Sequence, residues 1–128
     1  MKKRWVSTDG WRGYYQPVPP EGWELLADCG VVNQSGAQCR DIVAKWLRQN
    51  KIHYRSGYLR TSNVFSANFY IVVEAGKISD ELRDKIDNWF VDETTSTFSI
   101  FSGESWELDV ERAQHRFDAI VAGELVAA

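Results

Sequence analysis

The stretch VFSANFYIVVE, residues 64–74, decides the fold of this chain. On one side every second residue is apolar: Phe65, Ala67, Phe69, Ile71 and Val73. This two-residue period is typical of a β-strand with one fully buried face. The other side mixes polar and apolar residues, namely Val64, Ser66, Asn68, Tyr70, Val72 and Glu74. We therefore expect a strand whose apolar face lines the core.

Three amphipathic helices are predicted from apolar residues that recur at spacings of three and four. The first ends near Asn50, the second follows Ser79 as its N-cap, and Asp109 opens the third. Their apolar stripes are Cys39, Ile42, Val43, Trp46 and Leu47; then Leu82, Ile86, Trp89 and Phe90; then Val110, Ala113, Phe117, Ile120 and Val121. Each helix is expected to bury one face only.

Further strands are predicted over 23–31, 53–60 and 97–101. In the first, the face carrying Trp23 and Leu25 is expected to be the better buried one. In the second, Gly57 indicates a short or bulged strand. The element order is then β-α-β-β-α-β with an additional C-terminal helix. This order predicts an α+β, ferredoxin-like βαββαβ sandwich with an antiparallel sheet and two helices packed on one face.

Residues 1–22 differ in composition from the rest of the chain. Trp5, Trp11, Tyr14 and Tyr15 lie among six glycines and prolines, a density that opposes regular structure. We expect an irregular aromatic arm that packs on a single α+β domain of residues 23–124. The alternatives are a segment swapped between two copies and a peptide-binding surface.

Composition places the chain among ordinary globular proteins. It has 128 residues, of which 44% are hydrophobic and 26% charged, enough for one domain with a real core. Cys29 and Cys39 do not make a disulfide framework, and a reducing, cytoplasmic location is expected from them. No segment approaches the ~20 consecutive apolar residues of a membrane span, so no membrane partner is expected.

Charge is strongly segregated along the sequence. Residues 40–60 hold six basic residues and one acidic residue, a net charge of +5. Residues 74–111 hold three basic and eleven acidic residues, a net charge of −8. Such separation steers an anionic partner toward the basic segment, while the overall charge of −3 argues against broad coating of nucleic acid.

The candidate ligand-binding residues lie in and after this basic segment: Arg48, Lys51, Tyr54, Arg55, Tyr58, Arg60, Ser62 and Asn63. Arginine grips phosphate bidentately and tyrosine stacks on a base or sugar. Arg48 and Lys51 have an alternative explanation, since cations at a helix C-terminus complement its dipole and its carbonyls. The tyrosines and arginines of 53–60 can equally be a charged sheet edge, and 60–63 a hairpin turn.

A second candidate site is the polar face of the sheet. Glu24 and Asp28 are expected to share it with Ser66, Asn68 and Tyr70. This polar face suits a small ligand pocket. Alternatively, Glu24 and Asp28 bind a divalent cation. The favoured alternative is that the third helix and the aromatic arm cover this face.

The leading hypothesis is a small, non-enzymatic cytoplasmic binding protein that holds a nucleotide or nucleic acid at a basic, tyrosine-containing edge. The second is a protein-interaction module, whose acidic helix around Asp80, Glu81, Asp84 and Asp87 docks a basic partner or the basic segment of a second copy. The third is a metal-dependent enzyme using Asp28 and Glu24. No catalytic residue, cofactor or metal ligand is assigned, because no HxxxH, paired CxxC, GxSxG or P-loop spacing is present. Cys29 with His53 is only a formal nucleophile–base pair.

Overall fold

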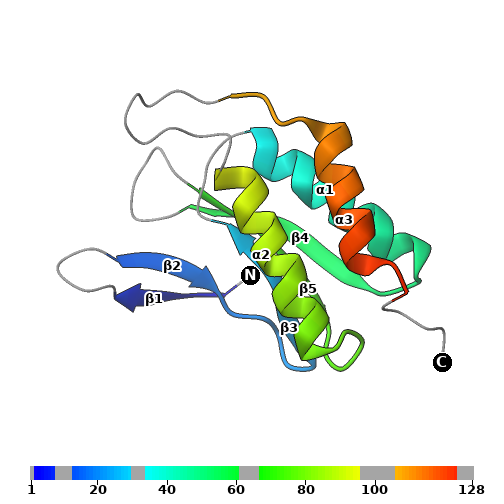
Figure 1. Cartoon of the computed structure of the whole chain (residues 1–128). Helices are drawn as coiled ribbons and strands as arrows, with labels where there is room; N and C mark the ends of the chain where they lie inside the picture. Colours follow the sequence, from blue (N-terminus) through cyan, green and yellow to red (C-terminus); the bar gives the residue numbers. More distant parts are fainter. Residues whose placement is uncertain (1, 8–12, 30–33, 61–66, 96–105, 124–128) are drawn as a thin grey trace.

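The computed structural model describes residues 2–7, 13–29, 34–60, 67–95 and 106–123. The chain is a mixed α+β protein with eight described elements (Figure 1). The strands are β1 (Lys3–Ser7), β2 (Gly13–Pro17), β3 (Trp23–Cys29), β4 (Tyr54–Arg60) and β5 (Ala67–Glu74). The helices are α1 (Gln34–Gln49), α2 (Asp80–Thr95) and α3 (Val110–Val121).

The strands form two antiparallel sheets. β1 pairs with β2, and the larger sheet has the order β3-β5-β4. β5 is the central strand, as its apolar pattern suggests: Ile71, Val72 and Val73 are fully buried. The predicted strand 97–101 and residues 64–66 lie outside the described residues. The ferredoxin-like order is therefore not confirmed.

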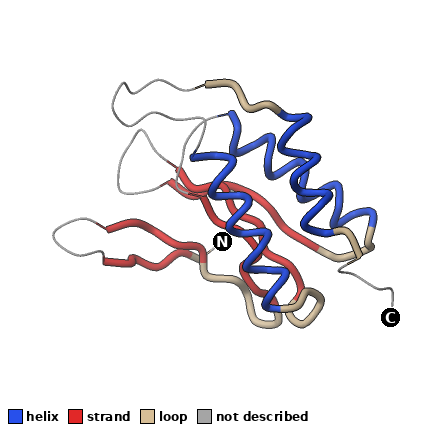
Figure 2. Tube along the Cα trace, in the orientation of Figure 1, coloured by secondary structure: helices blue, strands red, loops and turns tan. Residues whose placement is uncertain are grey.

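The elements are arranged in layers around the larger sheet (Figure 2). All three helices lie on one side of it, and the β1–β2 hairpin lies on the other. The hairpin side also buries side chains of β5, since Tyr70 is 9% exposed and Val72 0%. The expectation that the third helix covers this face is wrong, because α3 contacts α1 and α2 instead.

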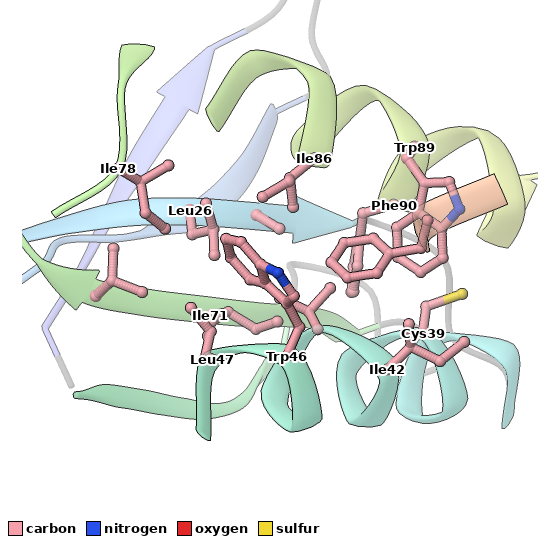
Figure 3. Close-up of a cluster of buried hydrophobic side chains, with 14 of the residues drawn as sticks. Leu26, Cys39, Ile42, Trp46, Leu47, Ile71, Ile78, Ile86, Trp89 and Phe90 are labelled. Carbon is pink, nitrogen blue, oxygen red and sulfur yellow. The ribbon is translucent and has the colours of Figure 1, made fainter. Parts of the chain in front are cut away.

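The core fills the space between the helices and the sheet (Figure 3). Ile71 and Leu26 project from the strands toward Leu47 and Ile86 on the helices. α3 joins this layer through Phe117, whose ring centroid lies 4.8 Å from Trp89 and 5.9 Å from Trp46. The ring of Trp89 is also held by its Nε1–H, which donates to the carbonyl of Ala113 at 3.2 Å.

The predicted caps of the second and third helices are confirmed. The hydroxyl of Ser79 accepts from the N–H of Leu82 at 3.2 Å, three residues into α2. The carboxylate of Asp109 accepts from the N–H of Arg112 at 3.1 Å at the start of α3. Each side chain satisfies a helix N–H that has no partner within its own helix.

A β-bulge changes the predicted faces of β3. The register with β5 shifts between Leu25 and Ala27, so strict alternation fails there. Leu26 and Ala27 are both buried, whereas Trp23 and Leu25 are only half-buried. The prediction that Trp23 and Leu25 mark the better buried face is therefore wrong. An extra residue in the strand cannot be seen from a two-residue pattern.

Gly57 does not mark a bulge, contrary to the sequence expectation. β4 pairs with β5 without interruption from Tyr54↔Val73 to Arg60↔Ala67. Gly57 lies opposite Tyr70, and a Cβ at this position would come 2.8 Å from the Tyr70 hydroxyl. Glycine is needed here because the tyrosine side chain crosses the backbone closely.

The N-terminal segment is not irregular where it is described. Residues 3–7 and 13–17 form a regular antiparallel hairpin, extended by a bond from the N–H of Val18 to the carbonyl of Lys2 at 2.8 Å. β2 runs close to β4. The prediction failed because glycine and proline flank these strands instead of interrupting them, with Gly13 and Pro17 at the ends of β2.

Candidate functional site

The candidate site begins where α1 ends. The N–H of Ile52 donates to the carbonyl of Leu47 at 3.0 Å, and the N–H of Lys51 to that of Arg48 at 3.1 Å. This pair of bonds is a Schellman motif, which requires a left-handed residue at the position of Lys51. Lys51 has φ 56° and is the one non-glycine residue with positive φ among those described. Glycine is the usual residue there because a side chain strains this conformation.

The turn at Lys51 opens a cleft between the end of α1 and the start of β4. Its volume is about 490 Å³, within the range of small-molecule sites. The lining residues are Trp23, Arg48, Lys51, Ile52, His53, Tyr54 and Arg55. We call this the basic cleft. It combines an indole and an isoleucine with three arginine or lysine side chains.

Contacts within the protein orient several of these side chains. Arg48 donates from its Nη1 to the hydroxyl of Tyr54 at 2.7 Å. The Arg55 guanidinium lies over the indole of Trp23, 4.9 Å from the ring centroid. Trp23 and Arg55 lie on different edge strands, so the two side chains meet above the central strand. A guanidinium stacked on an indole keeps its edge available to hydrogen-bond acceptors.

The positive charge of the basic cleft is not neutralised within the described part of the chain. There, no carboxylate forms an ion pair with Arg48, Lys51 or Arg55. The nearby Glu74 instead accepts from Nδ1 of His53 at 2.9 Å. Three cations around one cleft repel each other, and an anion relieves that repulsion.

The helix-end explanation for Arg48 and Lys51 loses part of its support. The carbonyls of Leu47 and Arg48 are capped by backbone N–H groups. The carbonyl of Trp46 accepts from both the backbone N–H and the Nδ2 of Asn50. Cationic side chains are therefore not needed to satisfy these carbonyls, and only the general helix dipole still favours them.

The structure brings together only part of the predicted ligand set. Arg48, Lys51, Tyr54 and Arg55 line the basic cleft. Tyr58 lies four residues beyond Tyr54 in β4 and is 61% exposed. The centroid of its ring lies 6.5 Å from that of Phe69. Arg60 ends β4, about 20 Å of extended strand from Tyr54. Ser62 and Asn63 lie outside the described residues.

Three lining residues are absent from the predicted set, namely Trp23, Ile52 and His53. Trp23 starts β3, thirty-two residues before Arg55, and only the order β3-β5-β4 reveals that both face the same side. His53 directly precedes β4 in the basic segment, so its place in the sequence was a usable signal. Trp23 adds the apolar surface that the predicted set lacked.

Two acidic residues of the sheet and of α2, Glu24 and Asp87, have partners within the protein. Glu24 accepts from Nη1 of Arg83 at 2.7 Å, and Asp87 accepts from the N–H of Asp28 at 3.2 Å. Burial raises the pKa of Asp87, against the lowering effect of its bond from Asp28. In the described ranges no three histidine, cysteine or acidic side chains gather as metal ligands do. The proposed pairing of Glu24 with Asp28 thus gains no support.

No family model, no curated protein sequence and no solved structure matches this chain. Over the described residues, none of the helices has the length and apolar character needed to cross a bilayer.

Proposed function

We propose that this protein binds a small phosphate-bearing ligand of the nucleotide class in the basic cleft. The observation that carries the proposal is the charge of the cleft: Arg48, Lys51 and Arg55 line it with no carboxylate partner in the described chain. Charge-assisted bonds from such groups to phosphate oxygens are stronger than neutral ones. The cleft volume suits one nucleotide better than a strand of nucleic acid.

The strained backbone at Lys51 supports the same proposal. A left-handed non-glycine residue costs about 1–2 kcal/mol, and such residues cluster at functional sites. Here the residue in question carries a positive charge into the basic cleft. Glycine would relieve the strain but would supply no charge, so a ligand that needs the ammonium group explains the choice of lysine.

Each part of the ligand has a group that suits it. Arg48 and Lys51 supply charge for the phosphates, and Arg48 is already oriented by the Tyr54 hydroxyl. Arg55 offers a second guanidinium, and the apolar surface of Trp23 and Ile52 suits a base or sugar. No reaction is proposed for this site.

Calorimetric titration with ATP, pyrophosphate and adenosine at about 50 and 200 mM salt tests the proposal. We expect ATP and pyrophosphate to bind more weakly at the higher salt concentration, since the attraction is electrostatic. Adenosine should bind far more weakly than ATP. Failure of ATP to bind at low salt, or affinity independent of salt, would refute the proposal. A short oligonucleotide that binds much more tightly than ATP would indicate a nucleic-acid site instead.

Single substitutions separate the basic cleft from the overall charge. Arg48→Ala and Arg55→Ala should each weaken ATP binding by about tenfold or more, the value of one charge-assisted bond. Lys45→Ala is the matched control, because Lys45 is an exposed cation of α1 outside the basic cleft. An equal loss in the Lys45 variant would mean that only net charge matters.

The finer fold assignment is also a proposal. We propose that the domain is ferredoxin-like, with residues 97–101 as the fourth strand of the larger sheet. The antiparallel order β3-β5-β4 and the position of α1 between β3 and β4 support it. Amide hydrogen exchange tests the strand, since backbone N–H groups of residues 97–101 should be protected if they join a sheet.

A further inference from the structure

β4 is the outer strand of the larger sheet, and no described strand is hydrogen-bonded to its outer edge, although β2 lies close to β4. β5 occupies one side of β4, and the larger sheet ends with β4. Unpaired edges of sheets are templates for a further strand, and proteins protect them with proline, bulges or charged side chains, of which β4 has only the charges of its arginines. β4 has no proline and its pairing with β5 runs without a bulge over all seven residues.

The register shows which backbone groups lie on this open edge. The carbonyl of His53 accepts from the N–H of Glu74, which makes this pair a hydrogen-bonded pair of the antiparallel ladder. Such pairs alternate along the ladder. Arg55, Gly57 and Leu59 therefore bond to β5. The N–H and C=O groups of the intervening residues point away from it: Tyr54, Ser56, Tyr58 and Arg60.

The charge around this edge selects the kind of segment that fits. β4 holds Arg55 and Arg60 and no acidic residue, and Arg48 and Lys51 lie beside its first residue. A second copy of β4 paired antiparallel would add two further arginines and no acidic residue to this edge, which is unfavourable. An acidic segment meets the opposite charge instead.

We propose that the open edge of β4 binds an extended acidic peptide segment of a partner protein by strand addition. The peptide backbone bonds to the outward groups of Tyr54, Ser56, Tyr58 and Arg60. Its acidic side chains on one face lie beside Arg55, while the exposed ring of Tyr58 contacts side chains on the other face. The site shares Tyr54 and Arg55 with the basic cleft but depends on the backbone of β4, so the two proposals can be tested apart.

The first test uses the unmodified protein and three seven-residue, end-blocked, fluorescent peptides. One alternates glutamate and threonine, one alternates lysine and threonine, and the third is the glutamate peptide with its five central nitrogens methylated. Fluorescence anisotropy should show binding of the glutamate peptide, with the other two at least about tenfold weaker. Equal binding of the methylated peptide would overturn the proposal, because that peptide keeps its charge and has no central backbone donors.

The second test changes the protein at Ser56. Ser56→Pro removes an outward N–H and leaves the bonds from β4 to β5 in place, which is where edge strands tolerate proline. Ser56→Pro should lower the affinity for the glutamate peptide about tenfold or more, while Ser56→Ala should change this affinity less than about twofold. ATP binding should be unaffected by both. If peptide binding survives in a folded Ser56→Pro variant, strand addition is wrong.

Solution mass tests whether a second copy of the chain occupies the edge instead. Sedimentation of the unmodified protein should show a monomer that the glutamate peptide does not convert to another state. A dimer that Ser56→Pro dissociates would show that a second copy occupies the edge, and would overturn the acidic-peptide assignment. If the unmodified protein binds the glutamate peptide but not ATP, only the nucleotide proposal is refuted.

Discussion

The left-handed conformation of Lys51 gives a prediction in which two variants differ in stability but not in ligand binding. Replacing Lys51 with glycine removes the strain of a side chain at φ 56°. Replacing it with alanine keeps that strain. Both variants lose the same positive charge, so electrostatic effects cancel when the two are compared. The difference between them reports the backbone alone.

The expected size of this difference follows from two opposing effects. A left-handed L-residue costs about 1–2 kcal/mol, and glycine gives back about 0.4–1 kcal/mol through the larger freedom of its unfolded chain. The glycine variant should therefore be more stable than the alanine variant by about 1 kcal/mol. For 128 residues, an unfolding entropy of about 2.1 cal/mol/K per residue converts this to a Tm difference of about 4 °C.

Urea unfolding and thermal melts of both variants measure the stability difference, and calorimetry with ATP measures binding. Both variants should bind ATP equally weakly, because both lack the ammonium group. An alanine variant as stable as the glycine variant would refute the strained turn. A glycine variant that binds ATP as well as the parent protein would remove Lys51 from the basic cleft.

Three further predictions concern the fold. Asp87→Asn keeps the acceptor for the N–H of Asp28. Because burial raises the folded pKa of Asp87 above its unfolded value, the parent should lose stability relative to the variant as pH rises above the ordinary aspartate pKa. Urea titrations at successive pH values measure this difference. A constant difference across pH would contradict this sign. Phe117→Ala should cost about 3–5 kcal/mol, because the ring is fully buried, and an unfolding midpoint close to that of the parent would contradict that packing. Gly36→Ala should destabilise α1 despite the better helix propensity of alanine, because its Cβ meets the ring of Phe69; a more stable variant in thermal melts would show that the ring yields.

The helices could be predicted from the sequence because each buries one apolar stripe, and the central strand because its core face is wholly apolar. The caps at Ser79 and Asp109 were equally readable, since they depend on local chemistry. The faces of β3 were not predictable, because a bulge depends on pairing with β5. The packing partners of α3 were not predictable either. Its apolar stripe shows that the face with Phe117 is buried, but not which elements bury it.

Only the site residues that are close together in the sequence were predicted. Arg48, Lys51, Tyr54 and Arg55 lie within eight residues and converge because one turn joins α1 to β4. Trp23 was invisible, since its place depends on strand order. Tyr58 was grouped with them by sequence distance, but an extended strand carries it ~13 Å from Tyr54.

Because Trp46 and Trp89 both contact Phe117 of α3, tryptophan fluorescence reports on the packing of this helix. Both indoles are buried, and each rests on Phe117. If α3 detaches while the sheet stays folded, both rings meet water together and their emission shifts to longer wavelength. Far-ultraviolet circular dichroism would record only the loss of twelve helical residues. A fluorescence transition that precedes the main loss of dichroism would therefore identify α3 as a separately melting part of the molecule.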